Sequence, residues 1–218
     1  MDKIKLAPGL IAIGFHGEKS NIEKTKFPIY LANKLAENEK VLFLNWNNYS
    51  RKLEQILTGL GWHKNPNLQI NTSVNYFGLE SFFDIIDLIE SEDYKTIFID
   101  DIFSFTMGDV QKFEDRDLVI KTLKFISDRF LVRIVFQMNI DDKMFLNSNY
   151  VYEVEPELGY FNWSRMIIND CEQVFAIKNL TGIIDDETDE FYQDETYRIY
   201  ELKNDSDITE NYIINLKK

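Results

Sequence analysis

The sequence has 218 residues, of which 44% are hydrophobic and 28% are charged, an ordinary composition for a globular domain. Its formal net charge of −13 disfavours a free-standing DNA binder, because such proteins gain affinity from basic residues that neutralise phosphates. A single cysteine excludes an internal disulfide framework, and no apolar run approaches the ~20 residues that span a bilayer. We therefore expect a cytoplasmic protein, with no membrane partner, that folds as one domain over residues 1–218.

Apolar runs that suit strands buried on both faces alternate along the chain with segments of helical spacing. The predicted strands are residues 10–14, 41–44, 96–100, 132–137, 174–177, 197–202 and 212–216. The predicted helices are residues 26–37, 51–60, 79–90 and 115–129. This order predicts a three-layer α/β fold, in which helices cover a mostly parallel sheet that ends in a C-terminal antiparallel extension.

Two of the predicted helices carry features that indicate how they lie. Pro28 is expected in the first turn of its helix, where its missing N–H would have no partner in any case. In the helix at 79–90, an apolar stripe is expected to face the core. The stripe consists of Phe82, Phe83, Ile86, Leu88 and Ile89.

Polar residues follow the carboxyl ends of several predicted strands. The segments concerned are residues 14–25, 45–48, 100–101 and 137–139. Ligands of open parallel sheets bind beyond the carboxyl ends of the strands. We therefore expect the functional site at this edge of the sheet.

The segment at residues 183–195 contains seven acidic residues and no basic residue. Such a run is ordinarily a solvated loop, but it also suits a docking surface for a basic partner or a mimic of nucleic-acid charge. Under either interpretation, the isolated chain is not expected to bind DNA tightly.

The order and spacing of several segments resemble the RecA-fold motor domain of DnaB-type replicative helicases. Residues 6–13 resemble the entry to the family's first strand, and residues 24–43 resemble its first helix and second strand. Asp100 ends a strand at the place of the Walker B strand, and residues 137–139 read Gln-Met-Asn where the family has Gln-Leu-Asn. The resemblance implies a RecA-like P-loop NTPase fold, with ATP and Mg²⁺ as the cofactors of its active members.

The phosphate-binding loop that this resemblance implies is altered. A P-loop follows the pattern Gly-x-x-x-x-Gly-Lys-Ser/Thr, because its backbone must curl until successive N–H groups point at phosphate. The best-aligned segment ends in Lys24 and Thr25 but has Glu18 and Glu23 at the glycine positions. A carboxylate about 4 Å from a phosphate charge repels it by roughly 4 kcal/mol, or about three orders of magnitude in affinity.

A second register of the same loop stays open. It uses Gly14 and Gly17 with Lys19 and Ser20, and so keeps glycines but at the wrong spacing. In either register the lysine and the hydroxyl residue are candidates for nucleotide binding. The competing interpretation is that these side chains only solvate a surface loop.

The family's other catalytic positions are changed as well. Asn47 aligns with the general-base glutamate, and an amide cannot accept a proton from attacking water. Lys203 begins the match to a Lys-x-Arg motif, but Asp205 replaces the arginine finger, which can be worth about 10³ to 10⁵ in rate. Asp100 remains as a candidate Mg²⁺ ligand, and Gln137 remains as a candidate sensor of the γ-phosphate.

These changes predict a non-hydrolysing domain that acts by binding, without ATP or Mg²⁺ as a required cofactor. Its partner is expected to be another protein or its own copies, in DNA replication, recombination or mobile-element maintenance. One alternative is a weak ATPase, or an ATPase completed by an arginine of another subunit. A second alternative is an accessory protein for single-stranded nucleic acid, which the net charge disfavours.

Overall fold

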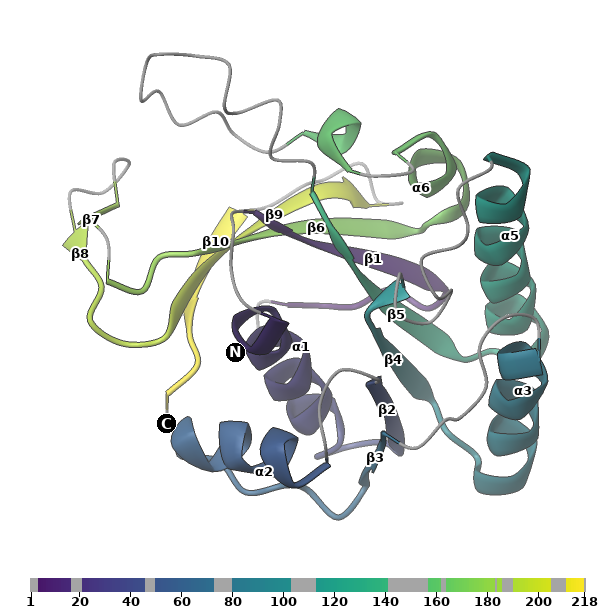
Figure 1. The fold of residues 1–218 in the computed structure, drawn as a ribbon, viewed down its shortest axis with the longest axis horizontal. Coiled ribbons are helices and arrows are strands. Elements are labelled where there is room, and N and C mark those ends of the chain that lie inside the picture. Colours follow the sequence, from purple (N-terminus) through teal and green to yellow (C-terminus); the bar gives the residue numbers. More distant parts are fainter. Residues whose placement is uncertain are drawn as a thin grey trace.

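The computed structural model places an eight-stranded sheet between two layers of helices (Figure 1). The residues that the structure describes are 4–16, 21–45, 50–72, 80–102, 113–140, 157–161, 164–182, 184–185, 190–204 and 211–217. The predicted α/β architecture is confirmed, including the antiparallel extension at the C-terminal end of the chain.

The main sheet has the strand order β10-β9-β6-β1-β5-β4-β2-β3. Its strands are β1 (Leu10–His16), β2 (Val41–Asn45), β3 (Leu68–Asn71), β4 (Thr96–Asp100), β5 (Arg133–Asn139), β6 (Gln173–Asn179), β9 (Thr196–Asn204) and β10 (Asn211–Asn215). The strands from β3 to β6 in this order are parallel, whereas β9 and β10 pair antiparallel. A separate two-stranded sheet joins β7 (Ile184–Asp185) to β8 (Glu190–Phe191).

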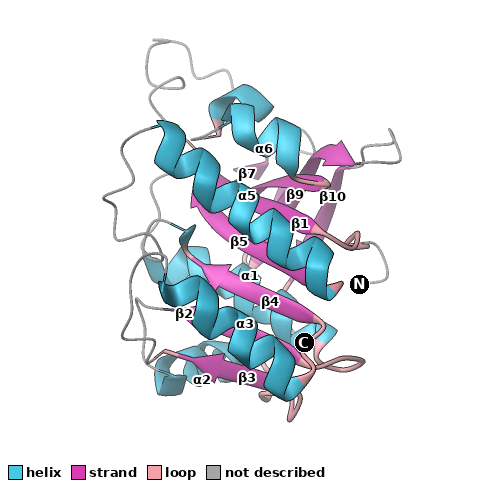
Figure 2. Ribbon diagram, turned by 90° about the vertical axis from the view of Figure 1, so that its right-hand side faces the viewer, coloured by secondary structure: helices cyan, strands magenta, loops and turns pink. Residues whose placement is uncertain are grey.

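Helices cover both faces of the main sheet. On one face lie α1 (Asn21–Leu35) and α2 (Ser50–Gly59). Figure 2 shows the opposite face, covered by α3 (Glu80–Glu92), α5 (Phe113–Phe130) and α6 (Ser164–Asp170), which a 3-10 turn, η2 (Leu158–Tyr160), precedes. Among the described residues, no helix is long and apolar enough to cross a membrane.

Alternate residues of the central strands supply two separate hydrophobic cores. In β1, Leu10 and Ala12 pack toward α3 and α5, whereas Ile11 and Ile13 pack toward α1 and α2. Successive side chains of a strand point to opposite faces, so a strand covered on both sides is apolar at nearly every position. This double burial explains why unbroken apolar runs predict the central strands.

Helix α1 differs from the prediction at its beginning. It starts at Asn21, five residues before the predicted position 26, so that Pro28 is its eighth residue. The prediction that Pro28 lies in the first turn was therefore wrong. Pro28 cannot supply the N–H that would bond to the carbonyl of Lys24. The helix continues through it because the neighbouring Phe27 and Ile29 are fully buried in the core, and packing outweighs local propensity.

Helix α3 buries a narrower stripe than its sequence suggests. Phe82, Ile85 and Ile89 face the core, whereas Phe83 is 67% exposed, so its predicted burial was wrong. A step of one residue turns a helix by about 100°, and Phe83 therefore points away from the face that Phe82 presents to the sheet.

Candidate functional site

The carboxyl ends of the strands bring polar side chains to the face that α1 covers. Phe43, Phe98 and Val135 belong to the core beneath α1. Side chains two residues apart in a strand share a face of the sheet. The polar residues that follow them at this spacing are Asn45, Asp100, Gln137 and Asn139. The strand alternation that builds the core thus also directs these groups toward α1.

Asp100 is the centre of a buried cluster of hydrogen bonds. The hydroxyl of Thr25, the fifth residue of α1, donates to Asp100 Oδ2 over 2.7 Å. The side-chain amide of Asn45 donates to the same oxygen over 2.6 Å. Parallel pairing of β2 with β4 sets Asn45 directly beside Asp100. Each of the three residues is at most 2% exposed, so one carboxylate oxygen receives two neutral donors away from water.

Burial raises the pKa of Asp100 to about 7. The hydrogen bond from Thr25 opposes this rise, the charge of Asp101 adds to it, and the hydrogen bond from Asn45 opposes it again. Within the part of the chain that the structure describes, Asp100 forms no ion pair with a lysine or arginine. A cation beside Oδ2 would favour the charged carboxylate and lower this pKa.

Lys24 and Gln137 occupy different surroundings from Asp100. The ammonium group of Lys24 donates to Asn139 Oδ1 over 2.8 Å in an exposed contact that joins α1 to the end of β5. Gln137 is 5% exposed, and its Oε1 accepts no hydrogen bond from the described residues. A buried acceptor without a donor costs about 1–3 kcal/mol, so this amide is suited to meet a donor from elsewhere.

Gly14 has a structural role inside β1. It pairs with Met138 of β5 and with Ala176 of β6. A Cβ at Gly14 would lie too close to the ring of Phe161, so a larger residue would not fit. The loop register that begins at Gly14 therefore begins within a strand. The other candidates of that register, Lys19 and Ser20, lie outside the described residues, as does Asn47.

The start of α1 bears on the register that ends in Lys24 and Thr25. In a P-loop, the residues before the lysine form a loop whose N–H groups surround the phosphates, and the helix opens after this loop. Here α1 already begins at Asn21, so residues 21–23 are helical. Three of the six residues expected in the loop, 18–23, are thus part of the first helical turn. This geometry does not fit the cradle that a triphosphate needs.

The oxygen atoms at Asp100 suit Mg²⁺ better than the loop suits phosphate. Mg²⁺ binds through one or two carboxylates together with waters, and it does not require a full set of protein ligands. Thr25 Oγ1 and Asp100 Oδ2 are two oxygen ligands that the fold holds in contact. Among the described residues, no group of three or more His, Cys, Asp or Glu side chains gathers in a way that could hold a metal ion.

Lys203 lies at the opposite edge of the sheet from Asp100. Antiparallel pairing of β9 with β6 sets Lys203 beside Val174, near the start of β6. Its ammonium group donates to the backbone carbonyl of Cys171. Lys203 is therefore not brought together with Asp100 within one chain, and Asp205, at the place of the arginine finger, lies outside the described residues. A role for Lys203 toward a neighbouring subunit stays a prediction.

Two polar residues of this edge received no individual role from the sequence. Asn45 contacts Asp100, and Asn139 contacts Lys24. Each is the last residue of its strand and shares a face with buried residues of the same strand. Strand-end position combined with period-two alternation is the signal that could have identified both.

Comparisons with known proteins place this architecture. No family model and no curated protein sequence matches the chain. The crystal structure of a KaiC-like protein, PH0186, from the hyperthermophilic archaeon Pyrococcus horikoshii OT3 matches with a TM-score of 0.63 and 14% identity, over 95% of this chain and 83% of that chain. The solved ATPase domain of a DnaB-like helicase matches with a TM-score of 0.70 and 10% identity, over 95% of this chain and 81% of that chain. The chain therefore has the RecA-like fold that its resemblance to helicase motor domains implies.

Proposed function

We propose that this chain is a RecA-like domain that does not hydrolyse ATP and acts by binding a protein partner or a second copy of itself. Its setting would be that of an interaction or regulatory module in DNA replication, recombination or mobile-element maintenance. The observation that carries this proposal is the start of α1 at Asn21, which turns half of the expected phosphate loop into helix.

The chemistry of the strand ends supports the same proposal. Asn45, Gln137 and Asn139 carry amides, which cannot take a proton from attacking water. Asp100 is buried, already accepts two hydrogen bonds, and has a pKa of about 7. In the sequence, glutamates replace the two loop glycines, at positions 18 and 23, which adds repulsion to the loss of the cradle.

Calorimetric titration with ATP and Mg²⁺ tests the proposal. We expect no heat of binding and no rise in melting temperature at saturating ATP, because a ligand stabilises a folded protein only when it binds. Phosphate release should equal that of an Asp100→Asn variant. Binding that disappears in Lys24→Ala, or turnover that disappears in Asp100→Asn, would contradict a non-hydrolysing domain.

One observation favours a second candidate, a weak ATPase completed by an arginine of another subunit. P-loop NTPases hold Mg²⁺ with the loop Ser/Thr and the Walker B aspartate, and Thr25 contacts Asp100 here. For this candidate, turnover should rise more steeply than linearly with protein concentration and should be lost in Thr25→Val. Turnover that is absent at every protein concentration would leave the non-hydrolysing domain as the better account.

A further inference from the structure

The small sheet of β7 and β8, here called the arm, exposes two apolar side chains. Ile184 is 63% exposed and Phe191 is 56% exposed. The antiparallel register sets Ile184 opposite Phe191, and Asp185 opposite Glu190. Directly opposed residues of two strands point to the same face. The arm therefore has an apolar pair on one face and an acidic pair on the other, and Figure 1 shows it projecting beyond the main sheet.

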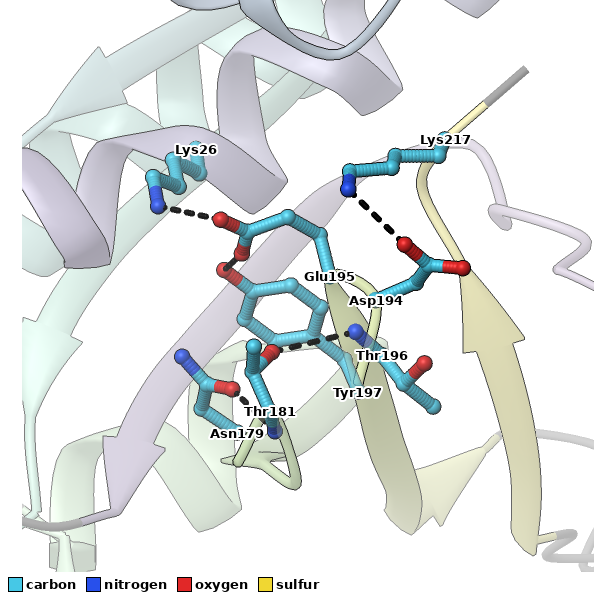
Figure 3. A network of polar contacts seen from close by, with 8 residues as sticks. All are labelled: Lys26, Asn179, Thr181, Asp194, Glu195, Thr196, Tyr197 and Lys217. Carbon is cyan, nitrogen blue, oxygen red and sulfur yellow. Dashed lines mark hydrogen bonds and ion pairs between the residues drawn. The ribbon is translucent and has the colours of Figure 1, made fainter. Parts of the chain in front are cut away.

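The base of the arm is fixed to the body of the domain (Figure 3). Lys26 of α1 forms an ion pair with Glu195 over 2.5 Å. Lys217, near the C-terminal end, forms a second ion pair with Asp194 over 2.8 Å. An element that is already held in place loses less conformational freedom on binding than a free loop would.

Most of the acidic charge of the arm is not used by these two ion pairs. Residues 183–195 contain seven acids, of which Asp194 and Glu195 form the pairs at the base. The other five lie between residues 185 and 190, in a segment that contains no lysine or arginine. Charge of one sign on a projecting element attracts a surface of the opposite sign and disfavours other partners.

We infer that the arm docks on a protein surface that carries lysine or arginine side chains around an apolar pocket. Ile184 and Phe191 enter the pocket, and the five acids contact its basic rim. This inference names the partner class for the interaction role proposed above, and it rests on that role. A second copy of the chain is a poor occupant because its net charge is −13, and nucleic acid is excluded by the same acidic charge.

Binding to a defined peptide tests the inference. The probe is a fluorescent synthetic peptide in which lysine and leucine alternate, and its anisotropy is measured with the full chain. We expect binding that added salt weakens, because exposed charges are screened within about 8–10 Å at physiological salt. The Ile184→Ser/Phe191→Ser variant should bind at least about tenfold more weakly, equivalent to about 1.4 kcal/mol.

A matched control replaces equally exposed aromatic residues elsewhere on the surface. Phe83 on α3 is 67% exposed and Phe125 on α5 is 62% exposed. The Phe83→Ser/Phe125→Ser variant should bind the peptide as the wild type does. A second control peptide, with lysine and serine alternating, should bind more weakly than the lysine–leucine peptide because it lacks the apolar component.

Equal binding by the wild type and the Ile184→Ser/Phe191→Ser variant would overturn the inference, as would equal binding of the two peptides. Both side chains are exposed, so the variant should keep the melting temperature of the wild type. If it does not fold, a variant with amides in place of the five acids gives the second test, and undiminished peptide binding would overturn the inference. The assay contains no nucleotide, so ATP turnover would contradict the proposed function without changing this result.

Discussion

Two clusters at opposite edges of the sheet join a threonine hydroxyl to a carboxylate, and they differ in how the charge is compensated. At the amino ends of β4 and β5, Thr96 donates to Glu39 over 2.5 Å, and Arg133 donates to Glu39 over 2.9 Å and to Thr96 over 2.8 Å. At the carboxyl ends, Thr25 donates to Asp100 over 2.7 Å. Asp100 has no lysine or arginine partner within the described residues.

The difference separates a structural cluster from a candidate site. Arg133 supplies the charge that a partly buried Glu39 needs, so the amino-edge cluster is complete within the chain. Asp100 is more deeply buried, yet only neutral groups donate to it, and its pKa rises to about 7. A buried carboxylate that lacks a cation is characteristic of positions where ligand chemistry takes place.

Removing the cation of the amino-edge cluster should have the largest effect on stability. Arg133→Ala leaves Glu39 without its partner beside Thr96, which is fully buried. Breaking a fully buried pair costs about 3–5 kcal/mol, and the side chains here keep 19% and 24% exposure. We therefore expect the free energy of unfolding in urea to fall by about 2 kcal/mol.

The control for this variant is Lys95→Ala. Lys95 and Asp93 form an ion pair whose side chains are 54% and 82% exposed, so its loss should leave the urea midpoint unchanged. Equal midpoints for Arg133→Ala and Lys95→Ala would show that the amino-edge cluster does not stabilise the fold.

The carboxyl-edge cluster should instead reveal itself through pH. The pKa of Asp100 is raised from 3.8 to about 7, so between these values the folded protein keeps a proton that the unfolded chain has lost. Wild-type stability should therefore fall as pH rises from about 4 to about 7, relative to Asp100→Asn, by about 1 kcal/mol per pH unit. Above about pH 8 the difference between the two proteins should be constant.

Urea unfolding of both metal-free proteins from about pH 5 to about pH 8 measures this difference. Parallel pH profiles would show that Asp100 titrates as a solvated carboxylate does, which would contradict its burial. Repeating the series with Mg²⁺ sharpens the comparison, because a cation bound beside Oδ2 should stabilise the wild type and leave Asp100→Asn unchanged.

Much of the architecture could be predicted because it rests on local patterns. Strands such as β1, β4 and β6 are buried on both faces and therefore form unbroken apolar runs. Where burial is one-sided or an element is short, as in β3 and α6, the pattern contains too few residues to identify it. The positions of Pro28 and Phe83 were wrong because packing against neighbours, rather than local spacing, decides them.

The site was predictable only in part, for a related reason. The rule that ligands bind beyond the carboxyl ends of parallel strands indicated the edge that contains Asp100 and Thr25. The contact of Asn45 with Asp100 depends on the register between β2 and β4, which are separated in the chain by α2, β3 and α3. No local pattern sets that register, so the partners of Asp100 emerge only in the folded chain.

Removing one hydrogen bond from Asp100 should have a moderate effect. Thr25→Val keeps the shape of the side chain and removes the hydroxyl, whose bond lowers the pKa of Asp100. We expect that pKa to rise further and the unfolding free energy at about pH 8 to fall by about 1 kcal/mol. The control is Thr122→Val, whose hydroxyl bonds to the Leu118 carbonyl in an exposed contact and should matter little. Equal losses in the two variants would deny the Asp100 cluster a special role.

Lys24→Ala should have the smallest effect on stability and gives the sharpest test of the site. Its exposed hydrogen bond to Asn139 should contribute less than about 0.5 kcal/mol, so the urea midpoint should hardly change. In a working P-loop, however, this lysine reaches the phosphates, and its loss would abolish nucleotide binding. A non-hydrolysing domain with a helical phosphate loop predicts the same response to ATP, namely none, in both proteins. An ATP-dependent rise in melting temperature that Lys24→Ala removes would instead assign Lys24 to a working phosphate site, with Thr25 and Asp100 as its metal ligands.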